Sequence, residues 1–122
     1  MPYQIIVEDE GLVFRFHGVV EFIEIMKANR EWYCRTDLDQ YRYHIWDFGN
    51  VDRLYMDEHD TRIVAEMDSM PFRLINKTKL ALIGHGNDLK NIFMKYVLAL
   101  KTEKIDAQVF DDESEARKWI GI

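Results

Sequence analysis

The sequence predicts an α/β fold in the order β-β-α-β-α-β-α-β-α, with a five-stranded, mostly parallel mixed sheet and four helices. Two observations predict it. Strand-like apolar runs alternate with segments of helical period along the chain, and the first two strands are separated by only a short turn. Alternation implies right-handed crossovers between parallel strands, whereas the hairpin makes the first strand antiparallel. The 122 residues are expected to form one domain over 1–122.

The first two strands are expected at 3–8 and 12–17, joined by a turn in which Gly11 can adopt a positive φ. In the second strand the side chains alternate between an apolar face and a polar face, namely Leu12, Phe14 and Phe16 against Arg15 and His17. One face of this strand is therefore expected in the core and the other at least partly in water.

A helix is expected over 20–33, and a strand buried on both sides over 42–48. The apolar positions of this helix form one stripe and an offset pair, namely Phe22, Ile23, Met26 and Tyr33, then Ile25 and Trp32. The next helix is expected to begin near Asp57 and Glu58, because acidic residues favour the positive end of the helix dipole. Pro71 is expected to kink or end it. Its expected apolar side consists of Ile63, Val64, Met67, Met70 and Leu74.

The last four elements are a strand at 79–84, a helix capped by Asn87 or Asp88, a strand at 107–110 and a helix over 112–120. The first of these helices has the clearest period in the chain, with Leu89, Ile92, Phe93, Tyr96, Val97 and Leu100 on one side. The inward side of the last helix is expected to consist of Ala116, Trp119 and Ile120.

Composition excludes several classes of protein. Hydrophobic residues are 48% and charged residues 31%, which argues against a disordered chain. The net charge of −6 argues against nucleic-acid binding, and its clustering at the helix starts around 57–60 and 111–115 suggests helix electrostatics rather than a cationic partner. The single cysteine, Cys34, excludes an internal disulfide and a cysteine-based zinc site, and is expected to be buried. No secretory signal and no membrane-length apolar run is visible, so a cytoplasmic location is expected.

Three segments of the sequence resemble the corresponding segments of a known protein family. The C-terminal run 109–120, Val-Phe-Asp-Asp-Glu-Ser-Glu-Ala-Arg-Lys-Trp-Ile, resembles the ending of the SpoIIAA-like proteins, small bacterial relatives of the STAS domain. Residues 45–51, Ile-Trp-Asp-Phe-Gly-Asn-Val, are similar to that family's strand-ending motif, and residues 79–84 to its fourth strand. The resemblance in element order covers essentially the whole chain. It implies a STAS-like fold, close to the CRAL-TRIO lipid-binding fold.

The resemblance also implies a kind of function. STAS domains of the anti-sigma antagonist branch bind a protein kinase and are switched by phosphorylation of a serine in an Asp-Ser-Ser-Gly motif. The corresponding stretch here, 54–58, is Leu-Tyr-Met-Asp-Glu and has no Ser or Thr, so the switch does not carry over. Asp57 could stand there as a fixed negative charge, but a carboxylate at a helix start is the favoured explanation. The resemblance implies a bacterial, non-enzymatic binding or regulatory module that engages a protein partner or itself.

Candidate binding residues follow from the predicted sheet, because ligands of parallel sheets bind outside the carboxyl ends of the strands. The candidates for ligand or partner binding are His17, Asp47, Gly49, Asn50, Asp57, His85 and Asn87. Imidazole and carboxylate groups suit metal binding or acid–base catalysis, but no HxH or HExxH spacing supports either. We therefore expect no catalytic residue, no metal and no cofactor.

Two further local patterns favour structural roles over binding roles. Residues 84–87, Gly-His-Gly-Asn, open a helix but lack the third glycine of GxGxxG and the lysine of a P-loop, so a tight turn is favoured over a phosphate site. Residues 57–60, Asp-Glu-His-Asp, point in different directions on a helix and are expected to form a solvated helix start.

Two alternatives stay open. The aromatic residues Trp32, Tyr33, Tyr41, Tyr43 and Trp46 could line an apolar pocket or an interface, although filling the core is favoured. A small apolar-ligand or lipid-binding protein, with its pocket between helices and sheet, is the second candidate function. The third is a small enzyme that uses His17, Asp47 or His85, which requires these groups within hydrogen-bond reach of a common substrate.

Overall fold

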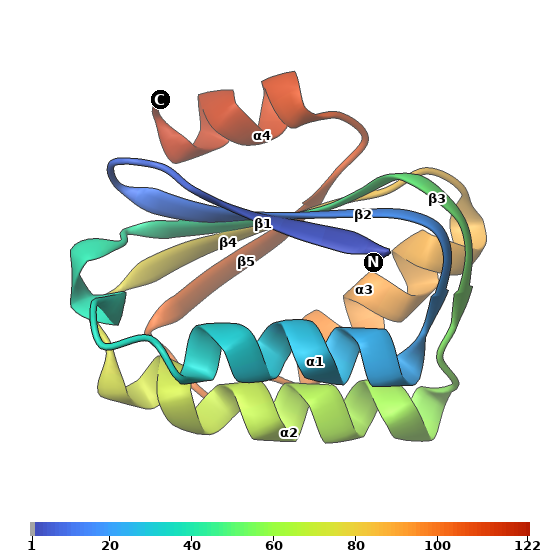
Figure 1. Cartoon of the computed structure of the whole chain (residues 1–122), viewed down its shortest axis with the longest axis horizontal. Helices are drawn as coiled ribbons and strands as arrows, with labels where there is room; N and C mark the ends of the chain where they lie inside the picture. The colour runs from blue at the N-terminus through green and yellow to red at the C-terminus, as the bar shows by residue number, and fades with distance from the viewer. Residues whose placement is uncertain (1) are drawn as a thin grey trace.

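The computed structural model describes residues 2–122, and its elements follow the predicted order (Figure 1). The strands are β1 (Tyr3–Val7), β2 (Gly11–Glu21), β3 (Tyr43–Tyr55), β4 (Thr78–Ile83) and β5 (Ile105–Phe110). The helices are α1 (Phe22–Tyr33), α2 (Glu58–Leu74), α3 (Asn87–Ala99) and α4 (Glu113–Ile120), with a short 3-10 helix, η1 (Leu38–Gln40), that was not predicted.

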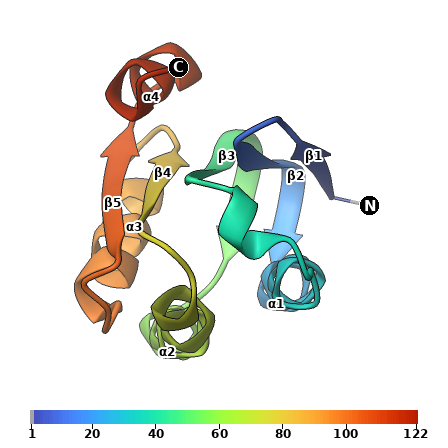
Figure 2. The same ribbon diagram turned by 90° about the vertical axis from the view of Figure 1, so that its left-hand side faces the viewer.

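The five strands form one sheet in the order β1-β2-β3-β4-β5. β1 runs antiparallel to β2, and all other neighbours are parallel. Helices α1, α2 and α3 lie on one face of the sheet and α4 lies alone on the other, as the two perpendicular views show (Figures 1 and 2). The predicted fold class, including the antiparallel first strand, is confirmed.

Each face of the sheet has its own apolar cluster, because successive side chains of a strand point to opposite faces. The larger cluster lies under α1, α2 and α3, and its fully buried members include Leu12, Phe14, Phe16, Trp32 and Phe72. The smaller one lies under α4 and comprises Val13, Tyr43, Ile45, Ala81, Ile83, Ala116 and Ile120. The predicted alternation along β2 is confirmed, since Leu12, Phe14 and Phe16 join the first cluster.

β2 and β3 are longer than predicted. β3 pairs with β4 only as far as Asp47 opposite Ile83, and then continues to Tyr55 with β2 as its strand partner. Register shifts after Arg15 and after Gly18 bend this pair, and Gly18 has a φ of 70° that favours glycine. Figure 1 shows the two strands curving toward the starts of α1 and α2. We call residues 48–55 of β3, together with the part of β2 that pairs with them, the β2–β3 arm.

The predicted inward faces of α1 and α2 were wrong in part. In α1 the offset pair Ile25 and Trp32 is buried, while Ile23 is 54% exposed. In α2 only Val64 of the predicted apolar side is buried. The side chains of α2 that are buried are Thr61, Val64, Ala65, Asp68, Ser69 and Phe72. The inward sides of both helices thus include polar residues, which a search for apolar stripes passes over.

Two local predictions were also wrong. Pro71 was expected to kink or end α2, but it does not end the helix, which continues to Leu74. Cys34 is exposed at the carboxyl end of α1 instead of buried. Within residues 2–122, no helix is both long enough and apolar enough to cross a membrane.

Candidate functional site

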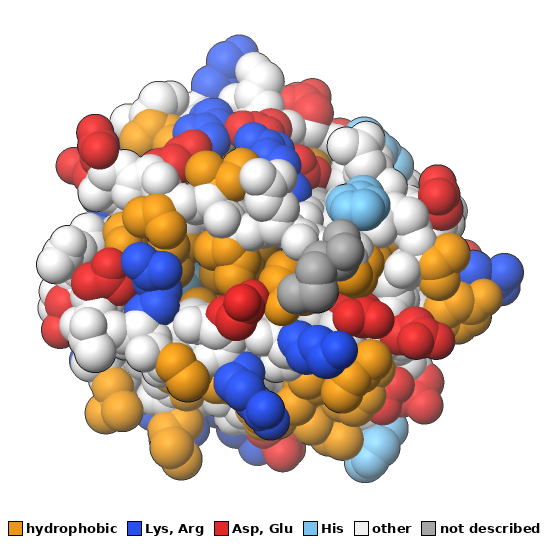
Figure 3. Space-filling model, viewed as in Figure 1, with side chains coloured by type: hydrophobic (Ala, Val, Ile, Leu, Met, Phe, Trp, Pro, Cys, Tyr) orange, Lys and Arg blue, Asp and Glu red, His pale blue; other side chains and the backbone are white. Residues whose placement is uncertain are grey.

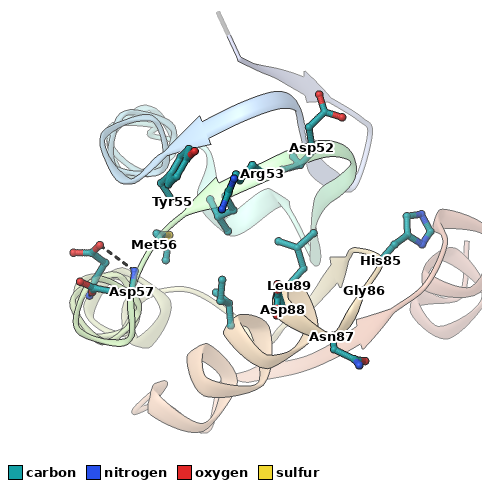
Figure 4. A pocket seen from close by; sticks show the side chains of 14 residues that line it. Asp52, Arg53, Tyr55, Met56, Asp57, His85, Gly86, Asn87, Asp88 and Leu89 are labelled. Carbon is teal, nitrogen blue, oxygen red and sulfur yellow. Dashed lines mark hydrogen bonds between the residues drawn. The ribbon is translucent and has the colours of Figure 1, made fainter.

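A groove of about 950 Å³ lies at the carboxyl edge of the sheet. It exists because β3 continues past the last pair with β4, so that the β2–β3 arm and the start of α3 stand apart (Figure 4). We call it the carboxyl-edge groove. It is lined by Val51, Asp52, Arg53, Leu54, Tyr55, Met56, Asp57 and Asp60 on one side and by His85, Gly86, Asn87, Asp88, Leu89 and Ile92 on the other.

An arginine and a tyrosine form a stacked pair in the wall of this groove. Arg53 and Tyr55 are two residues apart in β3, so both side chains leave the strand on the same face. The Arg53 guanidinium carbon lies 5.2 Å from the centre of the Tyr55 ring, a cation–π distance. Tyr55 is nevertheless 51% exposed. This pair was not predicted, because the strand was expected to end at residue 48, before Arg53 and Tyr55.

Asp57 lines the groove as the cap of α2. Its carboxylate accepts a hydrogen bond from the Asp60 backbone N–H at 2.7 Å, and Asp60 accepts one from the Asp57 backbone N–H at 3.2 Å. This reciprocal pair is a capping box, which satisfies two otherwise free backbone donors at the helix start. The prediction of a helix start at Asp57 and Glu58 is confirmed.

His85 and Asn87 lie at the rim of the groove, in the turn between β4 and α3, and their side chains point away from the β2–β3 arm (Figure 4). Gly86 caps α3 with a φ of 84°, which favours glycine, so the cap is Gly86 and not the predicted Asn87 or Asp88. Residues 84–87 therefore make the tight turn that was expected. His85 and Asn87 are both exposed, and they flank Gly86 (Figure 4).

Gly49 lies next to His85 and to Asp47, and the Asp47 carboxylate is already paired. It accepts hydrogen bonds from the Gly49 backbone N–H at 2.8 Å and from Arg15 at 2.7 Å. A β-carbon added at Gly49 would lie 3.0 Å from Oδ1 of Asp47, a tight contact, and 3.8 Å from Nε2 of His85, an ordinary one. The role of Asp47 in this arrangement is to bind Arg15 and to hold the bend of β3.

Arg15 belongs to an ionic network that binds α4 to the sheet. It donates to Glu113 at 2.6 Å, and Arg117 donates to Glu113 and to Glu8, each at 2.7 Å. Hydrogen bonds from Arg15 and Arg117 lower the pKa of Glu113 to about 2, despite partial burial. The polar face predicted for β2 thus faces α4 as well as water.

His17 and Asn50 sit inside the β2–β3 arm instead of at strand ends. They are opposite each other in the ladder, because both strands continue beyond them. Asp57 therefore lines one side of the groove and His85 and Asn87 line the other. Gly49 lies beside His85, and His17 and Asn50 are not among the groove-lining residues.

A buried carboxylate under the helices was missed entirely. Asp68 of α2 is 2% exposed and accepts hydrogen bonds from the hydroxyls of Tyr33 in α1 and Tyr96 in α3, the latter at 2.6 Å. Burial raises the pKa of Asp68 to about 7, against the opposing effect of the two hydrogen bonds. The spacing of Val64, Asp68 and Phe72, four residues apart, is the signal that would have placed it on the inward face of α2.

A small cavity of about 40 Å³ lies beside Asp68, between the helices and the sheet. Asn29 also lines it. Its Oδ1 accepts a hydrogen bond from Trp32 Nε1 at 3.0 Å, but its buried Nδ2 has no partner in the part of the chain described. A donor without an acceptor in a dry site is costly, so this amide marks a place for one more acceptor.

The predicted core aromatics are mostly in the core. Trp32, Tyr41, Tyr43 and Trp46 are buried, and Tyr33 is half-buried. Trp32 also covers His44, whose ring meets it edge-on at 5.1 Å. Burial lowers the pKa of His44 to about 3, so this histidine is neutral at ordinary pH. Among residues 2–122, no group of three or more His, Cys, Asp or Glu side chains is placed to hold a metal ion.

Comparison with solved structures identifies the fold. The anti-sigma factor antagonist SpoIIAA in its unphosphorylated form matches with a TM-score of 0.66 at 15% identity, over 98% of this chain and 99% of that chain. An uncharacterized DUF3478 protein from Shewanella loihica, described as having a SpoIIAA-like fold, matches with a TM-score of 0.59 at 14% identity, over 96% of this chain and 90% of that chain. The phosphorylated form of the Bacillus cell fate determinant SpoIIAA matches with 0.59 at 16%, over 97% and 98%. No protein-family model and no curated protein matches the sequence. The chain has a SpoIIAA-like, STAS-type fold.

Proposed function

Given this fold, we propose that the chain is a non-enzymatic binding or regulatory module of the cytoplasm, and that it engages a protein partner through the carboxyl-edge groove. The stacked pair of Arg53 and Tyr55 carries the proposal. Tyr and Arg are enriched among the residues that dominate binding energy at protein interfaces, and a pair held in place before binding loses little side-chain entropy. Here the pair is exposed in the wall of a groove.

Other features of the site support binding rather than catalysis. Asp47 and Asp57 are engaged in structural hydrogen bonds, so neither is available as a free general base. One of the similar structures is of the anti-sigma factor antagonist SpoIIAA, and another is of SpoIIAA in a phosphorylated form. Residues 54–58 of this chain contain no Ser or Thr, so we propose partner binding without a phosphorylatable serine at this position.

The test is affinity capture from an extract of the source cells, with three versions of the chain as bait. We expect a protein that is captured by the wild type and lost from the double variant Arg53→Ala/Tyr55→Ala. Removing both groups should weaken binding by at least about 30-fold, the effect of a hot-spot residue of about 2 kcal/mol. A matched control, Gln108→Ala/Lys118→Ala, changes two exposed residues on β5 and α4 and should capture the same protein. Equal capture by all three baits, or no captured protein, would contradict the proposal.

A small-ligand function is the second candidate, and the unpartnered Asn29 Nδ2 beside the cavity favours it. At about 40 Å³ the cavity holds only a few atoms, so an acyl chain would enter only if the helices moved away from the sheet. Native mass spectrometry of freshly purified protein should then show a retained small molecule, which Asn29→Leu should lose. A wild-type spectrum with only the mass of the chain would contradict this candidate.

A further inference from the structure

Helix α2 carries a second apolar stripe on the side opposite its buried face. The stripe consists of Ile63, Met67, Met70 and Leu74, and we call it the α2 stripe. Met70 is 67% exposed and Leu74 is 78% exposed. Together with Tyr33 of α1 and Pro71, these side chains line a shallow groove of about 560 Å³. Figure 3 shows hydrophobic and basic side chains interspersed along the edge of the molecule where α2 runs.

The spacing of the α2 stripe is that of a helix–helix seam. Its residues are separated by four, three and four positions, which is the a/d pattern of a heptad repeat. A helix that packs against a sheet requires only one buried face, and α2 already has one in its six buried residues. The second face therefore has the pattern expected for contact with another helix.

Charged residues along one side of the α2 stripe indicate which helix could pack against it. Glu66 and Arg73 are exposed, seven residues apart, and lie on the same side of the stripe. Two antiparallel copies of α2 can be related by a two-fold axis that passes near Met67 and Met70. Glu66 of each copy would then lie near Arg73 of the other copy, which gives two equivalent ion pairs. Opposite charges at such flanking positions determine partner and orientation in helix pairs. Glu66 also lies 4.0 Å from Lys101, but both are highly exposed, so this contact is weak.

We propose that the α2 stripe is a homodimer interface, in which α2 pairs antiparallel with α2 of a second copy of this chain. The 17 residues of α2 extend over about 25 Å. A seam of that length buries less than the roughly 800 Å² per partner of a standard interface. The dimer is therefore weak, with half-association at roughly 10–100 µM. The surface is distinct from the carboxyl-edge groove, so this proposal does not rest on partner binding there.

Charge reversal and its rescue test the pairing. In sedimentation equilibrium at roughly 200 µM, the wild type should be mainly dimeric. Glu66→Arg alone and Arg73→Glu alone should each be monomeric, because each single change puts like charges opposite one another. The double variant Glu66→Arg/Arg73→Glu should dimerise like the wild type. An equimolar mixture of the two single variants should also dimerise, since each then meets its opposite charge.

A matched pair of leucines tests the apolar part of the seam. Leu74→Lys should lower the association constant of the dimer by at least about 10-fold. Leu98→Lys, at an 81% exposed leucine of α3, should leave it unchanged. Circular dichroism should show that all variants are folded, as expected for changes at exposed positions. A monomeric wild type, equal effects of the two leucine changes, or a dimer indifferent to both charge reversals would overturn the proposal.

Discussion

The stability that the wild type has beyond that of Asp68→Asn is expected to fall as the pH rises from about 4 to about 8. The comparison is made between the two chains because buried His44, whose pKa is lowered to about 3, has the opposite effect on stability below pH 6.5 and is common to both. The pKa of Asp68 is about 7 in the folded chain, against an ordinary value of 3.8. Between these two values the folded chain keeps a proton that the unfolded chain has lost. The stabilising effect of that proton is present at low pH and is lost as the pH rises through 7, on the order of 4 kcal/mol in all.

Urea denaturation at a series of pH values measures this effect. In Asp68→Asn the amide oxygen can still accept a hydrogen bond from Tyr33 or Tyr96, so the variant should fold while lacking a titratable group. Asp106→Asn, at an exposed position of β5, is the matched control and should keep the slope of the wild type. Parallel curves for the wild type and Asp68→Asn would show that Asp68 does not titrate in this range.

Trp32→Ala is expected to lower the free energy of unfolding by about 3–5 kcal/mol, the usual cost of removing a large buried aromatic side chain. Trp32 is fully buried and stacks on Phe72 at 4.8 Å. Its removal also takes the hydrogen-bond donor from Asn29 and the aromatic cover from His44. Trp32→Phe should cost less, because it keeps a ring and loses mainly the hydrogen bond, worth about 1–3 kcal/mol when a buried acceptor is left unpaired.

Trp119→Ala is the comparison for that experiment. Trp119 lies at the edge of α4, in contact with Phe110 and with the Lys79 ammonium group at 4.9 Å, and is only partly buried. Its replacement should cost clearly less than that of Trp32 in the same urea titration. Equal losses at the two tryptophans would mean that the layer under α1 and α2 is not the main core of the fold.

The element order was predictable because strand and helix periods differ clearly along this chain, and the predicted sheet was confirmed. The inward sides of the helices were less accessible. In α2 the more hydrophobic side, with Met67, Met70 and Leu74, is exposed, whereas the buried side includes Asp68 and Ser69. Ser69 binds the Lys101 backbone N–H at 2.9 Å and Asp68 binds two tyrosines, so their polarity is compensated by tertiary partners that a sequence does not display.

The groove lies at the carboxyl ends of parallel strands, where the general rule predicts a site, and Asp57, His85 and Asn87 are among its lining residues. The stacked pair in the groove was not predictable from the same rule. Arg53 and Tyr55 lie beyond the point where β4 ends, in a strand that continues only because β2 accompanies it. The length of β3 is determined by its pairing with β2, a segment distant in sequence, and the local pattern of apolar and polar residues does not indicate it.

The most direct test of the binding proposal is hydrogen exchange of the chain alone and in complex with the protein that it captures. Slower exchange is expected at residues 51–57 and 85–89, which line the carboxyl-edge groove, with no change in α4 on the opposite face of the sheet. Slower exchange confined to α4 or β1, with none at the groove, would contradict the proposed site.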